Sequence, residues 1–177
     1  MPQLEVVKHF YFYTKGFIFI MNTKKLLLSI SLLGTLVLSG CASIPLATEQ
    51  ESSTAKSFSV PEKDKAGLYI YRDSFAGKAL KKDIYIDDKC LGETVDKTFF
   101  YTQVAGNQNH KISTESESSP NDLNLFTESG KNYFVRQYIK MGVFVGGAGL
   151  SVSTEDEGKR VISKTSMRLA KEGHCDN

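Results

Sequence analysis

The sequence has little excess charge of either sign and only three cysteines among its 177 residues. Lysine and arginine number 22, whereas aspartate and glutamate number 20. Four of the basic residues and one acidic residue precede Cys41, so the part from Cys41 onward carries 18 basic and 19 acidic residues. Because nucleic-acid binding leaves a basic footprint, this balance predicts no nucleic-acid partner.

Long apolar runs are also scarce, and the clearest one is too short to cross a membrane. The run Leu26–Leu38, "LLLSISLLGTLVL", contains 13 residues without a charge. As a helix it would be about 20 Å long, against about 30 Å for the hydrocarbon core of a bilayer. It follows "MNTKK", a short cationic segment. This order is typical of a signal peptide, which we place at Met21–Gly40 and expect to be removed.

The apolar run ends in "LSGC", which resembles the lipobox of bacterial lipoproteins. In that motif small residues precede a cysteine whose thiol takes a diacylglyceryl group and which becomes the new N-terminus. The resemblance implies that Cys41 is lipidated and attaches the protein to a membrane. The alternative, a buried cysteine in a core helix, is disfavoured because the run lacks an amphipathic period.

The first 20 residues stand in front of an already complete signal. We interpret Met1–Ile20 as an extension that is not translated, with Met21 as the start. The alternative keeps this aromatic segment as a real addition that lengthens the apolar region into an anchor.

The segment after the lipobox is rich in Ser, Thr, Glu, Lys and Pro and has no apolar period. This composition predicts that Cys41–Lys65 is a lipidated N-terminus followed by a flexible linker. A flexible chain of that length spans about 27 Å, so the folded domain would stand clear of the lipid headgroups.

From Ala66 to Asn177 short alternating or apolar runs are separated by turn residues. This pattern predicts an all-β domain of about eight strands, as a small antiparallel sandwich or flattened barrel. We expect a turn at "EDEG" and a short C-terminal helix around Ser166–Glu172, because "SMRLAKEG" closes with a glycine. The best strand candidates are "GLYIYR", "DIYIDD", "KTFFYTQV", "LNLFTE" and "YFVRQYIKM".

Three features of this domain resemble an uncharacterised family of bacterial lipoproteins, domain of unknown function 2846. They are the opening "LYIYR", the hairpin "DKCLG" and the "GNQNHKI" turn before a strand, and the similarity covers about Ala66–Leu169. The resemblance implies the β fold. It implies no catalytic residue, because the family has no assigned activity.

Two cysteines remain after lipidation, and an even pair in an oxidising compartment predicts a disulfide between Cys90 and Cys175. The bond would hold a polar C-terminal tail against the central hairpin. One alternative is a cysteine nucleophile, Cys90, activated by His110 or His174, but no third orienting group emerges. A zinc site from Cys90, His174 and Cys175 is disfavoured because adjacent ligands do not match the usual spaced pairs.

Other motifs for metals and nucleotides are absent. Asp83, Asp87 and Asp88 lack the spacing of an EF-hand, so we expect solvated turn carboxylates. The glycine-rich Gly142–Leu150 lacks the lysine and hydroxyl residue of a phosphate-binding loop. The sequence therefore predicts no metal site and no cofactor.

These observations predict a non-enzymatic, lipid-anchored protein of the bacterial cell envelope. Ala42 and Ser43 follow the lipidated cysteine, whereas an Asp at the first of these positions is typical of lipoproteins kept in the inner membrane. We therefore expect the outer membrane, with the domain facing the periplasm. The expected role is a structural or interaction module for an envelope protein or a glycan, and the alternative is a periplasmic hydrolase using Cys90 or His110.

Overall fold

The computed structural model describes residues 43–115, 121–140 and 146–175, which form nine strands and two short helices. The signal peptide, Cys41 and most of the "GVFVG" segment lie outside these ranges. None of the described helices is long and apolar enough to span a membrane. The elements are α2 (Glu49–Ala55), β1 (Lys65–Arg72), β2 (Lys82–Ile86), β3 (Lys89–Thr94), β4 (Thr98–Ala105), β5 (Gln108–Thr114), β6 (Asn121–Thr127), β7 (Asn132–Lys140), β8 (Gly147–Ser153), α3 (Glu155–Ile162) and β9 (Arg168–Leu169).

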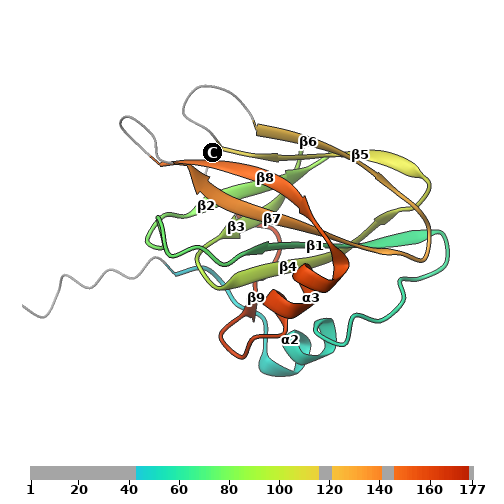
Figure 1. The fold of residues 1–177 in the computed structure, drawn as a ribbon, viewed down its shortest axis with the longest axis horizontal. Helices are drawn as coiled ribbons and strands as arrows, with labels where there is room; N and C mark the ends of the chain where they lie inside the picture. The colour runs from blue at the N-terminus through green and yellow to red at the C-terminus, as the bar shows by residue number, and fades with distance from the viewer. Residues whose placement is uncertain (1–42, 116–120, 141–145, 176–177) are drawn as a thin grey trace, which may run out of the picture. The chain divides into compact units, whose positions relative to one another are not determined.

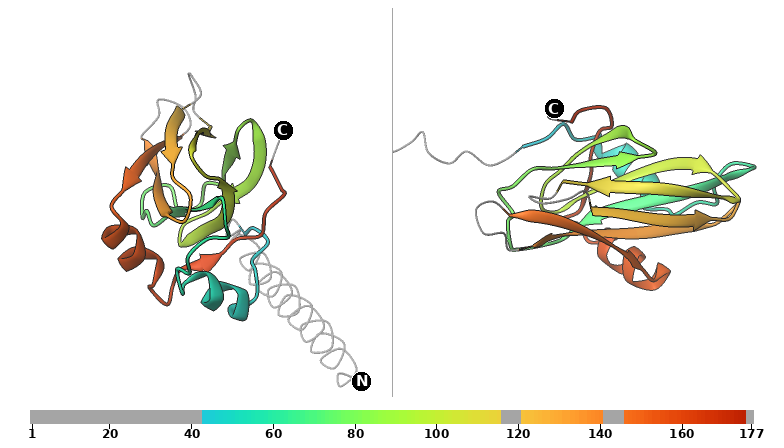
Figure 2. Two further views of the ribbon diagram at one scale, coloured as in Figure 1. Left: turned by 90° about the vertical axis from the view of Figure 1, so that its right-hand side faces the viewer. Right: turned by 90° about the horizontal axis from the view of Figure 1, so that it is seen from above.

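The strands form two sheets that pack face to face (Figures 1 and 2). One sheet has the order β8-β7-β1-β4-β9 and the other β3-β2-β5-β6, and they do not close into a barrel. The predicted all-β sandwich is confirmed. It is not purely antiparallel, because β1 pairs in parallel with β7 and β4 in parallel with β9. Long connections separate β1 from β7 and β4 from β9 in the chain, and such connections permit parallel pairing.

The centre of the five-stranded sheet is buried on both faces. In β1, Leu68 and Ile70 point into the core between the sheets, while Tyr69 and Tyr71 belong to a second apolar cluster on the outer face. Seven of the eight residues of β1 are consequently buried. The strand motif "LYIYR" is thus apolar on both faces because helices cover the face that a simple sandwich would leave in water.

Aromatic rings fill most of the outer cluster. The ring of Tyr69 stacks on Phe134 at 5.0 Å between centroids and on Tyr101 at 4.5 Å. The Tyr69 hydroxyl donates to the carbonyl of Ala55 at the end of α2. Burial raises the pKa of Tyr69, so this phenol stays protonated and keeps donating. The hydrogen bond therefore attaches α2 to the sheet.

Helix α3 begins where the sequence predicts a turn. The hydroxyl of Thr154 caps it by accepting from the Glu157 N–H, and acidic residues fill its first turn. The glycine that suggested a turn, Gly158, instead permits a close approach to the sheet: a Cβ there would lie 2.3 Å from ring atoms of Phe134. A packing requirement therefore explains a glycine inside the helix.

The predicted C-terminal helix over Ser166–Glu172 is wrong. Arg168 and Leu169 form β9 beside β4, and the Ala170 N–H donates to the carbonyl of Phe99. This segment is extended because the free edge of β4 offers its backbone hydrogen-bond partners, whereas a short isolated helix is unstable in water.

The predicted flexible linker is also wrong from Ile44 to Ala55. Helix α2 starts with a capping box, in which Thr48 and Glu51 satisfy each other's backbone N–H groups. Ile44 is 9% exposed and Ala55 is 7% exposed, because both pack onto the domain. The sequence does not predict these contacts, because the apolar residues of this segment follow no helical or strand period.

A segment before α2, which we call the N-terminal strap (Ile44–Ala47), pairs with the end of the chain. The Ala47 N–H donates to the carbonyl of Leu169, and the Lys171 N–H donates to that of Pro45. Leu46 lies opposite Ala170 as an antiparallel bridge. The strap therefore extends the five-stranded sheet beyond β9, although it is far from β9 in sequence.

We expect a variant that begins at Glu62 to be less stable than one that begins at Ser43. The deletion exposes apolar surface at Tyr69 and removes buried Ile44 and Ala55, a loss of about 3 kcal/mol or more. For a domain of this size, thermal unfolding should then occur about 10 °C lower. Equal melting temperatures would show that the segment is a linker after all.

Candidate functional site

A β-bulge in the β2–β3 hairpin shapes a buried polar part of the domain. The register shifts by one residue between Ile84 and Tyr85, which leaves Leu91 as the extra residue, packed in the core between the sheets. Its neighbour Gly92 has a φ of +149°, and a Cβ there would lie 2.8 Å from Cζ of Phe100. A glycine is therefore required both by the backbone and by the core.

The bulge turns Cys90 to the same face as two acidic residues. Asp83 lies directly opposite Glu93, and Tyr85 lies opposite Cys90. In a regular strand Cys90 and Glu93, three positions apart, would point to opposite faces. The extra residue cancels this alternation and gathers all four side chains on the outer face of the four-stranded sheet.

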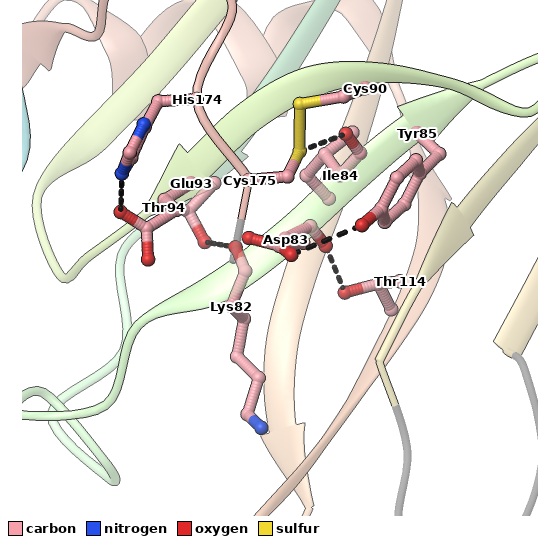
Figure 3. The surroundings of a disulfide bond; sticks show 10 residues. All are labelled: Lys82, Asp83, Ile84, Tyr85, Cys90, Glu93, Thr94, Thr114, His174 and Cys175. Atoms are coloured by element: carbon pink, nitrogen blue, oxygen red, sulfur yellow. Dashed lines mark hydrogen bonds and ion pairs between the residues drawn. A yellow bond between two sulfur atoms is a disulfide. The ribbon is translucent and has the colours of Figure 1, made fainter. Parts of the chain in front are cut away.

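The disulfide predicted from the cysteine count is confirmed. Cys90 is bonded to Cys175, with the two Cα atoms 6.1 Å apart and a sequence separation of 85 residues (Figure 3). The Gly173 N–H also donates to the carbonyl of Leu91 at 2.8 Å. The tail therefore lies along β3, held by one covalent bond and one backbone hydrogen bond.

Two acidic residues are buried beside this tail. Asp83 is 1% exposed and Glu93 is 3% exposed. Glu93 accepts from Lys81 Nζ at 3.0 Å, and His174 Nε2 lies 4.0 Å from the same carboxylate oxygen. The Tyr85 hydroxyl donates to Asp83 at 3.2 Å (Figure 3). Burial first, and the Asp83 carboxylate second, raise the pKa of Tyr85.

This arrangement places two buried carboxylates opposite each other. Opposed carboxylates repel each other when both are ionised, and the ammonium group of Lys81 supplies a nearby compensating charge. Asp83 and Glu93 have almost no contact with solvent, so a substrate cannot reach them while the tail is in place. Within the described ranges no group of three or more His, Cys, Asp and Glu side chains could hold a metal ion.

His110, a candidate base in the hydrolase alternative, is buried. It is 3% exposed, its Nδ1 lies 2.6 Å from Asp87 and its Nε2 lies 2.8 Å from the carbonyl of Ala105. Both ring nitrogens of His110 therefore have hydrogen-bond partners. Burial raises the pKa of Asp87, but hydrogen bonds from His110 and from the Lys111 N–H outweigh it and lower that pKa. His110 thus fastens the β2–β3 turn to β5.

The sequence identified the cysteines but missed the environment around them. The sequence predicts a solvated Asp83, and this prediction is wrong, because Asp83 is buried on the face of the hairpin along which the C-terminal tail lies. Glu93 and Lys81 belong to no sequence motif that would single them out. A signal was present in the alternation of "DIYID", which puts Asp83 and Tyr85 on one face, but alternation alone predicts an exposed polar face.

The fold and the site together define a β-sandwich with two outer helices and a C-terminal tail held by a disulfide. The model of the family "Protein of unknown function (DUF2846)" matches residues 62–148. An uncharacterized protein of Haemophilus influenzae is 58% identical over 148 residues, which is 83% of this chain and 88% of that protein. The chain belongs to the DUF2846 family. The family match contains Cys90 and the bulge but not Cys175.

We expect Gly92→Ala to destabilise the domain by about 2 kcal/mol or more, because the new Cβ meets Phe100 and the φ disfavours a side chain. Gly130→Ala is the matched control: its φ of +77° is also positive, but nothing lies within 4 Å of a Cβ there. Chemical denaturation should show the larger loss for Gly92. Equal losses would mean that the bulge can move away from Phe100.

We expect Cys90→Ser and Cys175→Ser to lower stability by similar amounts, and the double variant to lower it little further. Either change opens the same bond, which by loop entropy contributes about 4 to 5 kcal/mol. Thermal unfolding under oxidising conditions measures the effect. Additive losses would mean that the cysteines act separately and would restore Cys90 as a candidate nucleophile.

Proposed function

We propose that the protein is a lipoprotein of the bacterial cell envelope, anchored in the outer membrane through lipid on Cys41 and facing the periplasm. The observation that carries the proposal is the order of a cationic segment, the apolar run Leu26–Leu38 and "LSGC". Several acyl chains anchor a protein firmly, because each buried methylene contributes about 0.8 kcal/mol. Ala42 after the cysteine supports the outer membrane.

The disulfide supports an oxidising compartment. Cys90 and Cys175 lie at the surface of a small domain, where reducing conditions would keep both thiols reduced and unbonded. A bond between them is the arrangement expected of a protein that folds after export. It is independent of the lipobox, because it involves different cysteines.

We further propose that the domain is an interaction module and not an enzyme. The hydrolase alternative needs a free thiol at Cys90 or a free ring nitrogen on His110. Cys90 is disulfide-bonded, and both nitrogens of His110 are hydrogen-bonded. Neither group is therefore available to a substrate in this arrangement, which favours the interaction module.

A surface for an envelope protein or a glycan is available on β6. This strand is at the edge of the four-stranded sheet, and its exposed residues are Asp122, Asn124 and Phe126. Phe126 is 51% exposed. An edge strand offers backbone hydrogen bonds to a protein, and an exposed ring with polar neighbours suits either class of partner.

We expect Cys41→Ala to abolish labelling of the protein by radioactive palmitate and to leave the signal peptide uncleaved. The cause is loss of the thiol that receives the lipid. Metabolic labelling followed by immunoprecipitation and mass measurement tests this, with Cys90→Ser as a control that keeps the lipobox. Normal labelling of Cys41→Ala would contradict the proposal.

A further inference from the structure

We propose that one end of the sandwich, the strap end, lies directly against the phospholipid headgroups. The strap end consists of the N-terminal strap (Ile44–Ala47), the C-terminal residues Ala170–Glu172 and the β1–β2 loop (Asp73–Lys81). The inference rests on the proposed lipidation of Cys41. It adds an orientation and a second membrane contact, neither of which lipidation by itself requires.

The first argument is the length of chain between the lipid and the fold. Only Ala42 and Ser43 separate Cys41 from Ile44. Three Cα-to-Cα steps therefore join the two residues, so their Cα atoms are at most about 11 Å apart. A flexible linker through Lys65 would instead allow about 27 Å. Ile44 is held in the domain, because it is 9% exposed and belongs to the core between the sheets. The domain therefore stays close to the bilayer.

The second argument is that the strap, which follows Cys41 closely, is bonded to the C-terminal segment, and that this segment is itself bonded to both sheets. The strap is hydrogen-bonded to Leu169 and Lys171, and Ala170 is hydrogen-bonded to Phe99 in β4. The C-terminal segment is itself fastened by the disulfide to β3. The strap cannot swing away from the sheet without breaking these contacts, so a lipid at Cys41 fixes which end of the domain faces the membrane.

The β1–β2 loop opens at that same end. The last residue of β1, Arg72, pairs with Thr98, and Thr98 pairs with Arg168 at the start of β9. Neighbouring strands are about 4.8 Å apart, so β1 and β9 are separated by about 10 Å. Figures 1 and 2 agree that the strap and the loop after β1 are at one end of the sandwich.

The loop carries a side chain suited to the lipid interface. Phe75 is 87% exposed, the most exposed of the large apolar side chains among the described residues. Lys78 Nζ lies 5.3 Å from the centre of its ring. Aromatic rings enter the headgroup region, and a lysine can keep its ammonium in water beside them.

A buried arginine holds this loop in place. Arg72 is fully buried and donates to the carbonyls of Leu80, at 2.7 Å, and Gly77. Asp73 at the start of the loop pairs with Lys164, at 2.6 Å, and with Lys97. Phe75 is thus presented from a fixed loop, and the apolar side chain of Leu46, 39% exposed, lies on the strap at the same end.

The opposite end provides a matched control. Thr127 donates to the carbonyl of Ala105 at the far end of β4, six residues after Phe99. At about 3.3 Å per residue this position is about 20 Å from the strap. Phe126, next to Thr127, is also an exposed phenylalanine. Phe75 and Phe126 therefore differ in position but not in chemical type.

The chain has no tryptophan, so one introduced tryptophan is a unique reporter. We would purify the lipidated protein carrying Phe75→Trp, Leu46→Trp or Phe126→Trp and reconstitute it in phosphatidylethanolamine and phosphatidylglycerol vesicles with brominated acyl chains. Bromine quenches tryptophan at short range. We expect Phe75→Trp and Leu46→Trp to lose most of their fluorescence and Phe126→Trp to lose little.

An added linker tests whether covalent geometry is the cause. About twenty Gly and Ser residues inserted between Ala42 and Ser43 span about 25 Å. This insertion should reduce quenching at Leu46→Trp to the level of Phe126→Trp. Vesicles without phosphatidylglycerol should leave the original pattern unchanged. Quenching that needs anionic lipid, or that survives the linker, would overturn this explanation.

Flotation of the vesicles separates failure of the inference from failure of lipidation. If the unsubstituted lipidated protein does not float with vesicles, the proposed anchor is wrong. If all variants float and are folded by their melting curves but Phe75→Trp and Phe126→Trp are quenched equally, the anchor stands and the orientation is overturned. Phe75→Trp keeps an exposed aromatic residue, so this comparison does not depend on a disruptive substitution.

Discussion

The attachment of the C-terminal segment is the constraint on which much of the structure depends. Residues 168–175 form β9, give the N-terminal strap its hydrogen-bond partner and cover the outer face of the β2–β3 hairpin. The segment is short and polar, so burial alone would hold it weakly. The bond from Cys175 to Cys90 supplies the missing stabilisation, and it does so at the end of the tail, where fraying would otherwise start.

This attachment explains why polar groups are buried in a small domain. Asp83 and Glu93 are buried on the outer face of the hairpin, beside the tail. With the tail in place they need partners, and Lys81, Tyr85 and His174 lie on the same side. On the other side of the hairpin turn, His110 and Asp87 satisfy each other in a similar way. Both polar groups join segments that the β ladders alone would leave loosely connected.

The proposed anchor and the observed strap have one consequence together. A lipoprotein with a long linker can take many distances from the membrane and many orientations. This domain would instead keep the strap end near the lipid, and β6 would have a fixed orientation relative to the membrane. A partner would then meet the domain at a restricted height and angle. Such restriction raises the effective concentration of a membrane-associated partner.

The amino-acid sequence by itself determined the all-β class, the pairing of Cys90 with Cys175 and membership of the DUF2846 family, because alternation, cysteine number and local motifs are local properties. It also supplied the segment "LSGC", whose resemblance to a lipobox is the basis of the proposed location. Only the tertiary structure decided the parallel pairings of β1 and β4, the helices at Glu49–Ala55 and Glu155–Ile162 and the burial of Asp83 and Glu93. Each of these depends on contacts between segments distant in sequence. Helix α2 needs the aromatic face of β1, Gly158 packs against the ring of Phe134, and a tail more than 80 residues away lies beside the two carboxylates. Patterns within a short window cannot contain that information, because the hydrogen bonds and apolar surfaces that favour one conformation over another belong to the partner segment.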